Sequence, residues 1–227
     1  KQAGLDGERS GLYSEVLRFT ASQRPERVLI ENVPALLHYL PRLSADFRAL
    51  GYGLTWTVCE AADAGLPHLR RRVFVLAELD RAGRGAVEVD QARRWQDGDL
   101  RTWATATATD YKTPAGFVRT NHPPARIGEQ LFAEQGKRPS ADWVEALMGY
   151  PLGWTAPEGA ALADIPPPVR GRYPVGWDRS TPWPGFDWEP PRTLPDGVKA
   201  PGRAARIRGL GNAWAPAQGA LALRALL

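Results

Sequence analysis

The chain has 227 residues, a net charge of +4 and a hydrophobic content of 43%, which is ordinary for a soluble globular protein. No stretch of the sequence reaches the roughly 18 apolar residues of a membrane span, and no secretory signal pattern is present. The single cysteine, Cys59, excludes an internal disulfide framework, and the three histidines show no zinc-ligand spacing. The sequence therefore suits a reducing, cytoplasmic compartment, and its positive charge is compatible with a polyanionic partner.

The first half of the chain alternates predicted helices and strands, which is typical of an α/β sheet. A helix is predicted after Ser10 because apolar residues recur there at i, i+4 and i+7, which would place one face on a core: Leu12, Val16 and Phe19. A short helix at 35–40 is expected to stop at Pro41, and a second helix at 44–50 is expected to be capped by Ser44 and closed by Gly51. The predicted strands cover residues 28–30, 52–59 and 73–77.

Three arginines, Arg70 to Arg72, directly precede the strand predicted at 73–77. That strand is apolar throughout, so we expect it to be buried on both faces inside a parallel or mixed sheet. A loop thus delivers guanidinium groups to the end of a buried strand, and Arg70 and Arg72 would point the same way in extended chain. Ligands bind at such strand ends in open α/β sheets. The alternative is that these charges only keep the strand end soluble.

Glu31 follows the strand predicted at 28–30, so its carboxylate is expected at the carboxyl edge of the sheet. A carboxylate there can take part in acid or base chemistry. The alternative is a helix-cap or loop carboxylate, and the local pattern leaves both interpretations open.

The second half of the chain is rich in Pro, Gly and Trp and is predicted to be loop-rich. Residues 81–137 lack long periodic segments, and the stretch 103–112 is either an edge strand or an extended loop. A helix follows Ser140 and ends at Gly149, with a core-facing stripe of Val144, Leu147 and Met148. The basic residues between 192 and 208 either touch phosphate or form a solvated face. A Gly211-Asn212 turn then opens a last helix at Pro216, whose buried stripe is predicted to be Leu223, Leu226 and Leu227.

Four blocks in this order resemble the cytosine-5 DNA methyltransferase family in its phage-like form. They are Glu31-Asn32-Val33, the arginine-containing segment 62–74, residues 138–155, and Gly211-Asn212-Ala213. The resemblance implies a Rossmann-like catalytic domain that uses S-adenosyl-L-methionine to methylate a cytosine flipped out of double-stranded DNA. Residues 1–90 would be the C-terminal half of that α/β domain and residues 91–137 a small, loop-rich target-recognition region. A connecting motif with wrapping loops (138–200) and a final helix returning to the catalytic domain (201–227) would complete the chain.

The resemblance also implies roles for individual residues. Glu31 would contact N3 and the amino group of the cytosine and favour protonation of N3. Arg70 and Arg72 would hold the flipped nucleotide and steady Glu31. Asn212 and Ala213 would lie against S-adenosyl-L-methionine. The basic residues assigned to double-stranded DNA are Lys112, Arg119 and Arg126.

The sequence departs from the family pattern in its nucleophile. The family's Pro-Cys block and Gly-rich cofactor loop are absent, and Cys59 follows Val58 inside a predicted strand, so we interpret it as a small buried hydrophobe. His68 replaces a glutamine frequent in the family. We therefore expect an N-terminally truncated, monomeric methyltransferase without a metal, whose missing segment carries the nucleophile and the cofactor loop. The alternatives are a non-catalytic DNA-binding half of a split or inactive methyltransferase, and an ordinary α/β domain whose arginines are a solvated face.

Overall fold

The computed structural model describes residues 11–64, 66, 68, 70–79, 87–89, 103–112, 126–150, 153–156, 192–194 and 202–227. The chain divides into two compact units. The first comprises Lys1–Cys59, Arg71–Ala92 and Leu221–Leu227, and the second comprises Glu60–Arg70 and Arg93–Ala220. No helix among the described residues is long and apolar enough to cross a membrane.

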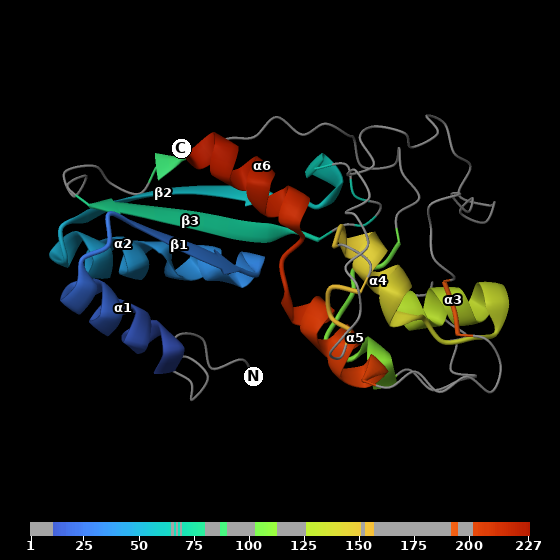
Figure 1. Ribbon diagram of the computed structural model, residues 1–227. Helices are drawn as coiled ribbons and strands as arrows, with labels where there is room; N and C mark the ends of the chain where they lie inside the picture. The colour runs from blue at the N-terminus through green and yellow to red at the C-terminus, as the bar shows by residue number, and fades with distance from the viewer. Residues whose placement is uncertain are drawn as a thin grey trace. The chain divides into compact units, whose positions relative to one another are not determined.

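The first unit is built on a four-stranded sheet with the strand order β1-β3-β2-β4 (Figure 1). Strand β3 runs antiparallel to both β1 and β2, whereas β4 runs parallel to β2. The strands are β1 (Arg27–Asn32), β2 (Tyr52–Cys59), β3 (Arg72–Leu79) and β4 (Val87–Glu88). The predicted strands at 28–30, 52–59 and 73–77 are confirmed, and the sheet is mixed.

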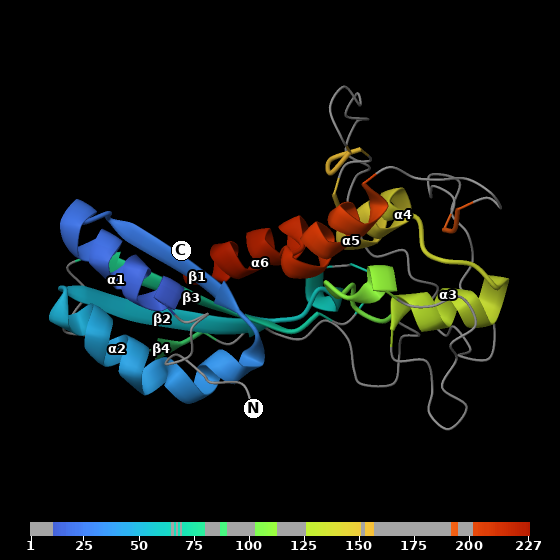
Figure 2. The same cartoon turned by 90° about the horizontal axis from the view of Figure 1, so that it is seen from below.

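Helices cover both faces of this sheet. Helix α1 (Gly11–Gln23) and helix α2 (Leu40–Ala49) lie on one face, and the C-terminal turns of α6 (Pro216–Leu226) lie on the other (Figure 1). Seen from below, α1 and α2 lie in front of the strands (Figure 2). Val73, Val75 and Ala77 of β3 share one core cluster with residues of α2, and Val73 to Ala77 are all buried. The prediction of a strand buried on both faces is confirmed.

Helix α1 packs through a different face from the predicted one. The three residues of the predicted stripe are exposed, Leu12 by 75%, Val16 by 36% and Phe19 by 59%. Tyr13 and Leu17 pack against the core instead, and Tyr13 Oη donates a hydrogen bond to Asp46 Oδ2 of α2 at 2.9 Å. The predicted helix is confirmed, but the prediction of its buried face is wrong because contacts with a distant helix set its rotation.

Pro41 does not stop a helix. A 3₁₀ helix, η3 (Pro34–Tyr39), leads directly into α2, and Pro41 lies in the first turn of α2, where a missing N–H leaves no helical hydrogen bond unmade. Ser44 therefore lies inside α2 and does not cap it. Gly51 follows with a φ of 90°, which favours glycine, so the predicted end of this helix is confirmed.

The second unit is mostly helical among its described residues. Its core contains Trp103 and Trp143, whose ring centroids lie 4.9 Å apart at an interplanar angle of 78°. The elements are η4 (Ala62–Ala64), η5 (Asp110–Lys112), α3 (Ile127–Gln135), α4 (Ala141–Met148), α5 (Arg203–Asn212) and the first turns of α6. The predicted stripe of α4 is confirmed because Val144, Leu147 and Met148 are all buried. Ser140 Oγ caps this helix by accepting a hydrogen bond from Trp143 N at 3.1 Å.

Other parts of the second half differ from expectation. Helices α3 and α5 were not predicted. The stretch 103–112 is not an edge strand: it has a single bridge from Trp103 to His68 and then runs without regular structure through a turn into η5. In α6 the buried residues are Gln218, Gly219, Ala222 and Leu226, whereas Leu223 is partly exposed and Leu227 is exposed, so the predicted leucine stripe is only partly right. The buried face of α6 thus contains alanine and glutamine as well as leucine, so a pattern of leucines alone does not define it.

Two leucine substitutions test the packing of the helices in the first unit. We expect Leu43→Ala to lower the free energy of unfolding by about 2–5 kcal/mol because its side chain is fully buried in α2. Leu12→Ala is expected to change it by less than about 0.5 kcal/mol, since that side chain lies on the surface. Urea unfolding of the whole chain measures both, and equal losses would contradict the observed rotation of α1.

Candidate functional site

The first part of the candidate site lies at the edge of the sheet where β1 and β2 end and β3 begins. Because β3 is antiparallel to both neighbours, its first residue, Arg72, lies opposite Cys59, the last residue of β2. Glu31 is the next-to-last residue of β1 and pairs with Phe74. Arg72 Nε lies 2.8 Å from Glu31 Oε1. The structure thus brings together two of the three residues that the sequence predicts as catalytic.

This ion pair is partly buried, with side chains that are 24% exposed for Glu31 and 16% exposed for Arg72. Burial lowers the pKa of the Arg72 guanidinium below its ordinary value, and the charge and hydrogen bond of Glu31 oppose that shift. An arginine stays protonated at neutral pH. Arg72 Nη1 also donates to the carbonyl of Arg71 at 2.8 Å. The cation therefore fixes one oxygen of the carboxylate while the side chain remains reachable from solvent.

Arg70, the third predicted catalytic residue, belongs to the second unit and is only 2% exposed. Its Nη1 donates to the carbonyl of Ala106 at 3.0 Å, and its Nη2 donates to the carbonyls of Gly211, at 3.1 Å, and Ala213. Each of these carbonyls lies far from Arg70 in the sequence. The guanidinium therefore fastens chain segments to one another inside this unit.

The predicted cofactor residues lie where Arg70 is anchored. The sequence predicts that Gly211 and Asn212 form a turn that opens the last helix, but they are the final residues of α5, and Ala213 begins the link to α6. A Cβ at Gly211 would collide with the backbone of Thr107 and Ala108, so only glycine permits this approach. Asn212 is exposed. The chain is thus held firmly around an exposed carboxamide.

The residues assigned to DNA are only partly covered by the structure. Lys112 ends η5 and is exposed. Arg126 immediately precedes α3 and is partly exposed. Arg119 lies outside the described residues.

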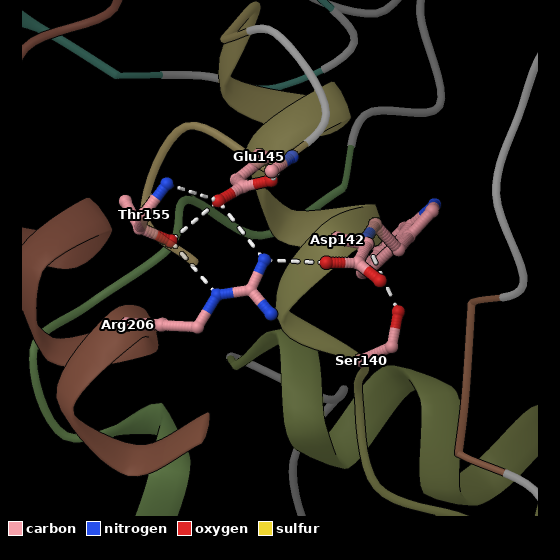
Figure 3. A network of polar contacts seen from close by, with 7 residues as sticks. Ser140, Asp142, Glu145, Thr155 and Arg206 are labelled. Atoms are coloured by element: carbon pink, nitrogen blue, oxygen red, sulfur yellow. Dashed lines mark hydrogen bonds and ion pairs between the residues drawn. The ribbon is translucent and has the colours of Figure 1, made fainter. Parts of the chain in front are cut away.

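A buried polar network joins α4 to α5 (Figure 3). Glu145 is fully buried, and its two oxygens accept hydrogen bonds from the backbone N–H groups of Gly153 and Thr155, each at 2.7 Å. Arg206 Nη2 lies 3.0 Å from Glu145 Oε1 and also pairs with Asp142. Burial acts to lower the pKa of Arg206, but the hydrogen bonds and charges of Asp142 and Glu145 outweigh it, and the pKa is raised.

The sequence contains one signal for this network, which is a charged residue inside an apolar helix. Glu145 lies within a helix whose stripe is otherwise apolar, between Val144 and Leu147. A carboxylate in such a position requires a buried partner, since an unpaired buried charge is costly. The partner, Arg206, is 61 residues away, so only the structure could identify it.

The fold is shared with solved methyltransferases. The match to the crystal structure of the S. pombe Dnmt2 methyltransferase covers 100% of this chain and 73% of the Dnmt2 chain, with a TM-score of 0.52 and 15% identity. The match to the structure of the Entamoeba histolytica methyltransferase EhMeth covers 97% of this chain and 68% of the EhMeth chain, with a TM-score of 0.50 and 13% identity. At these identities the likeness concerns the fold alone.

The family itself is shown by sequence. The profile described as C-5 cytosine-specific DNA methylase matches residues 1–114, which is half of the chain. The chain belongs to this family, whose members use S-adenosylmethionine.

Curated relatives match parts of the chain. The Type II methyltransferase M.NgoFVII of Neisseria gonorrhoeae is 36% identical over 81 residues, which are 34% of this chain and 22% of that protein. The Type II methyltransferase M2.BsuMI of Bacillus subtilis is 27% identical over 181 residues, which are 67% of this chain and 46% of that protein. The chain spans less than half the length of these two relatives.

The two carboxylates that contact Arg206 provide a matched test of the network. We expect Glu145→Ala to lower the free energy of unfolding by about 3–5 kcal/mol because it leaves a largely buried guanidinium and buried N–H groups without their acceptor. Asp142→Ala removes a side chain that is 54% exposed and is expected to cost less than about 1 kcal/mol. Urea unfolding compares them, and similar losses would show that the buried carboxylate does not hold the network together.

Proposed function

We propose that the chain is part of a DNA (cytosine-5-)-methyltransferase, which transfers a methyl group from S-adenosyl-L-methionine to C5 of cytosine in double-stranded DNA. The observation that carries the proposal is the Glu31–Arg72 ion pair at the sheet edge, found in a member of the C-5 cytosine-specific DNA methylase family. A carboxylate held by a guanidinium at a strand end is suited to binding a polar ligand. The target base must leave the stack to reach such a site.

Glu31 acts on the cytosine ring through the oxygen that Arg72 leaves available. Arg72 holds Oε1, and Oε2 has no hydrogen-bond partner within the described part of the chain. An ionised carboxylate in this orientation accepts hydrogen bonds from the amino group and from a protonated N3, so it stabilises the positive charge that makes C6 open to attack. Arg72 keeps Glu31 oriented. It is partly exposed, so it can also contact a nucleotide phosphate.

The remaining candidate residues are proposed to bind S-adenosyl-L-methionine, to position its binding residues or to contact DNA. S-adenosyl-L-methionine supplies the methyl group, and Asn212 and Ala213 are the residues proposed to hold it. They fit this role because the backbone around them is fixed by Arg70 while the Asn212 carboxamide is exposed, with a donor and an acceptor available to a polar ligand. Arg70 is proposed to be a positioning residue for this end of α5. Lys112, Arg119 and Arg126 are proposed to contact DNA.

We propose that Cys59 is not the nucleophile and that the nucleophilic cysteine is supplied from outside these 227 residues. Cys59 is the only cysteine in the chain, and it is fully buried at the end of β2. A thiol with no solvent access is a poor nucleophile. The same observation favours a second candidate function, in which the chain is a non-catalytic DNA-binding half of a split or inactive methyltransferase.

The isolated chain is expected to show no methyl transfer to cytosine-containing duplex DNA above background, because no thiolate is available to attack C6. Incorporation of tritiated methyl groups from labelled S-adenosyl-L-methionine measures this directly. Incorporation that Cys59→Ser abolishes would contradict the structural role given to Cys59.

A complemented enzyme tests Glu31. When the chain is joined to a family segment carrying a Pro-Cys nucleophile and a Gly-rich cofactor loop, activity is expected to appear, and Glu31→Gln is expected to lower kcat by about 10²- to 10⁴-fold. The control is Glu15→Gln, which alters another glutamate paired with an arginine, Arg18, on the exposed surface of α1. If activity appears with the unsubstituted chain and with Glu15→Gln but not with Glu31→Gln, the result supports the proposed methyltransferase. Near-normal turnover by Glu31→Gln overturns the role of this carboxylate, and no rescue in any form favours the non-catalytic alternative.

A further inference from the structure

A cationic cluster on the second unit takes no part in the buried networks described above. It consists of Tyr111 and Lys112 at the end of η5 and Arg208 on α5, and we call it the basic–aromatic patch. Arg208 Nη2 donates to Tyr111 Oη at 2.9 Å, and the Arg208 Cζ lies 4.9 Å from the centroid of the tyrosine ring. Lys112 Nζ lies 5.7 Å from the same centroid. One ring therefore holds two cations close together.

Both cations are available to a ligand. Lys112 and Arg208 are exposed, and neither forms an ion pair with a carboxylate within the described part of the chain. The neighbouring carboxylate, Asp110, is 1% exposed and accepts a hydrogen bond from the Thr107 N–H at 2.6 Å, so it faces inward. Like charges held near one another repel, and an anion placed between them removes that cost. The patch therefore favours a ligand that carries negative charge.

The backbone beneath the patch is fixed. Helix α5 approaches the segment 107–108 so closely that Gly211 admits no side chain, and Asp110 closes the turn that leads to Tyr111 (Figure 1, where residues 103–112 are bright green). The hydrogen bond from Arg208 lowers the pKa of Tyr111, against a smaller opposing effect of burial. Side chains ordered before binding lose less conformational entropy when a ligand arrives.

We propose that the basic–aromatic patch is a contact site for the phosphate backbone of double-stranded DNA, with Arg208 and Lys112 each neutralising one phosphate. The proposal rests on the proposed function for its choice of polyanion. A guanidinium and an ammonium on an exposed, rigid surface make the sequence-independent contacts that set affinity and position on a duplex. Arg208 thus joins the residues assigned to DNA, although it lies far from the target-recognition region in the sequence.

The salt dependence of duplex binding tests the patch. The affinity of the whole chain for a short fluorescein-labelled duplex of mixed sequence is measured by anisotropy between about 50 and 200 mM salt. Arg208→Gln and Lys112→Gln are each expected to reduce the magnitude of the slope of log K against log salt by about 0.9, and the double variant by about 1.8. Arg18→Gln is the control, since it removes one exposed arginine from α1 in the first unit.

The outcomes separate this inference from the proposed function. A parent slope that only the patch variants reduce supports the patch. A parent slope that Arg208→Gln and Lys112→Gln leave unchanged, or that Arg18→Gln reduces as much, overturns the patch and leaves the methyltransferase proposal standing. A parent chain that binds the duplex with no salt dependence overturns both. Circular dichroism confirms that each variant is folded, and if Arg208→Gln is not, the exposed Lys112→Gln decides the result.

Discussion

The reversed direction of β3 is the constraint on which the sheet-edge site depends. A strand antiparallel to both neighbours begins where they end, so the first residue of β3 must lie beside the last residues of β1 and β2. Glu31 and Arg72 are separated in the sequence by η3, α2, β2 and η4, yet this register brings Arg72 Nε to within 2.8 Å of Glu31 Oε1. The central position of β3 also buries it on both faces, and a slip in its register against β1 would move Arg72 away from Glu31 and break the pair.

Strands β1, β2 and β3 and helix α4 could be predicted from the sequence because their apolar patterns admit one arrangement, whereas the two-residue strand β4 was not predicted. Five consecutive apolar residues follow Arg72, and no polar position offers β3 a solvent-facing side. In α1 the pattern is ambiguous, since Tyr13 and Leu17 form a second apolar row beside the row that contains Leu12. The hydrogen bond between Tyr13 and Asp46, 33 residues apart, favours the second row. Local periodicity contains no information about such a contact.

Helix α5 was missed for a related reason. It is rich in arginine, contains Gly209 and Gly211, and has only Ile207 and Leu210 as buried hydrophobes, so neither helix propensity nor amphipathicity favours it. Its stability comes from tertiary contacts, through Arg206 to Glu145 and through the close approach of Gly211 to residues 107–108. The same limit applies to the candidate site. The residue types at positions 31, 70 and 72 were found by motif, but which arginine meets the carboxylate depends on chain reversal and on distant carbonyls.

Burial divides the arginines by what each can do. An arginine removed from water must find acceptors for its N–H groups inside the protein, because an uncompensated buried charge costs several kcal/mol. Arg70 meets this requirement with backbone carbonyls and Arg206 with carboxylates, so neither guanidinium can reorient toward a phosphate without leaving those groups unpaired. Arg208 is exposed and packs against the ring of Tyr111. An incoming anion can therefore bind it by displacing water, without breaking an ion pair among the described residues. Arg72 lies between these extremes, since one carboxylate and one backbone carbonyl hold it and it is still partly exposed. Arg70 and Arg72, one residue apart in the sequence, thus differ: Arg70 ties segments of the second unit together, whereas Arg72 pairs with Glu31 at the candidate site. The difference arises from the acceptors that the fold places around each.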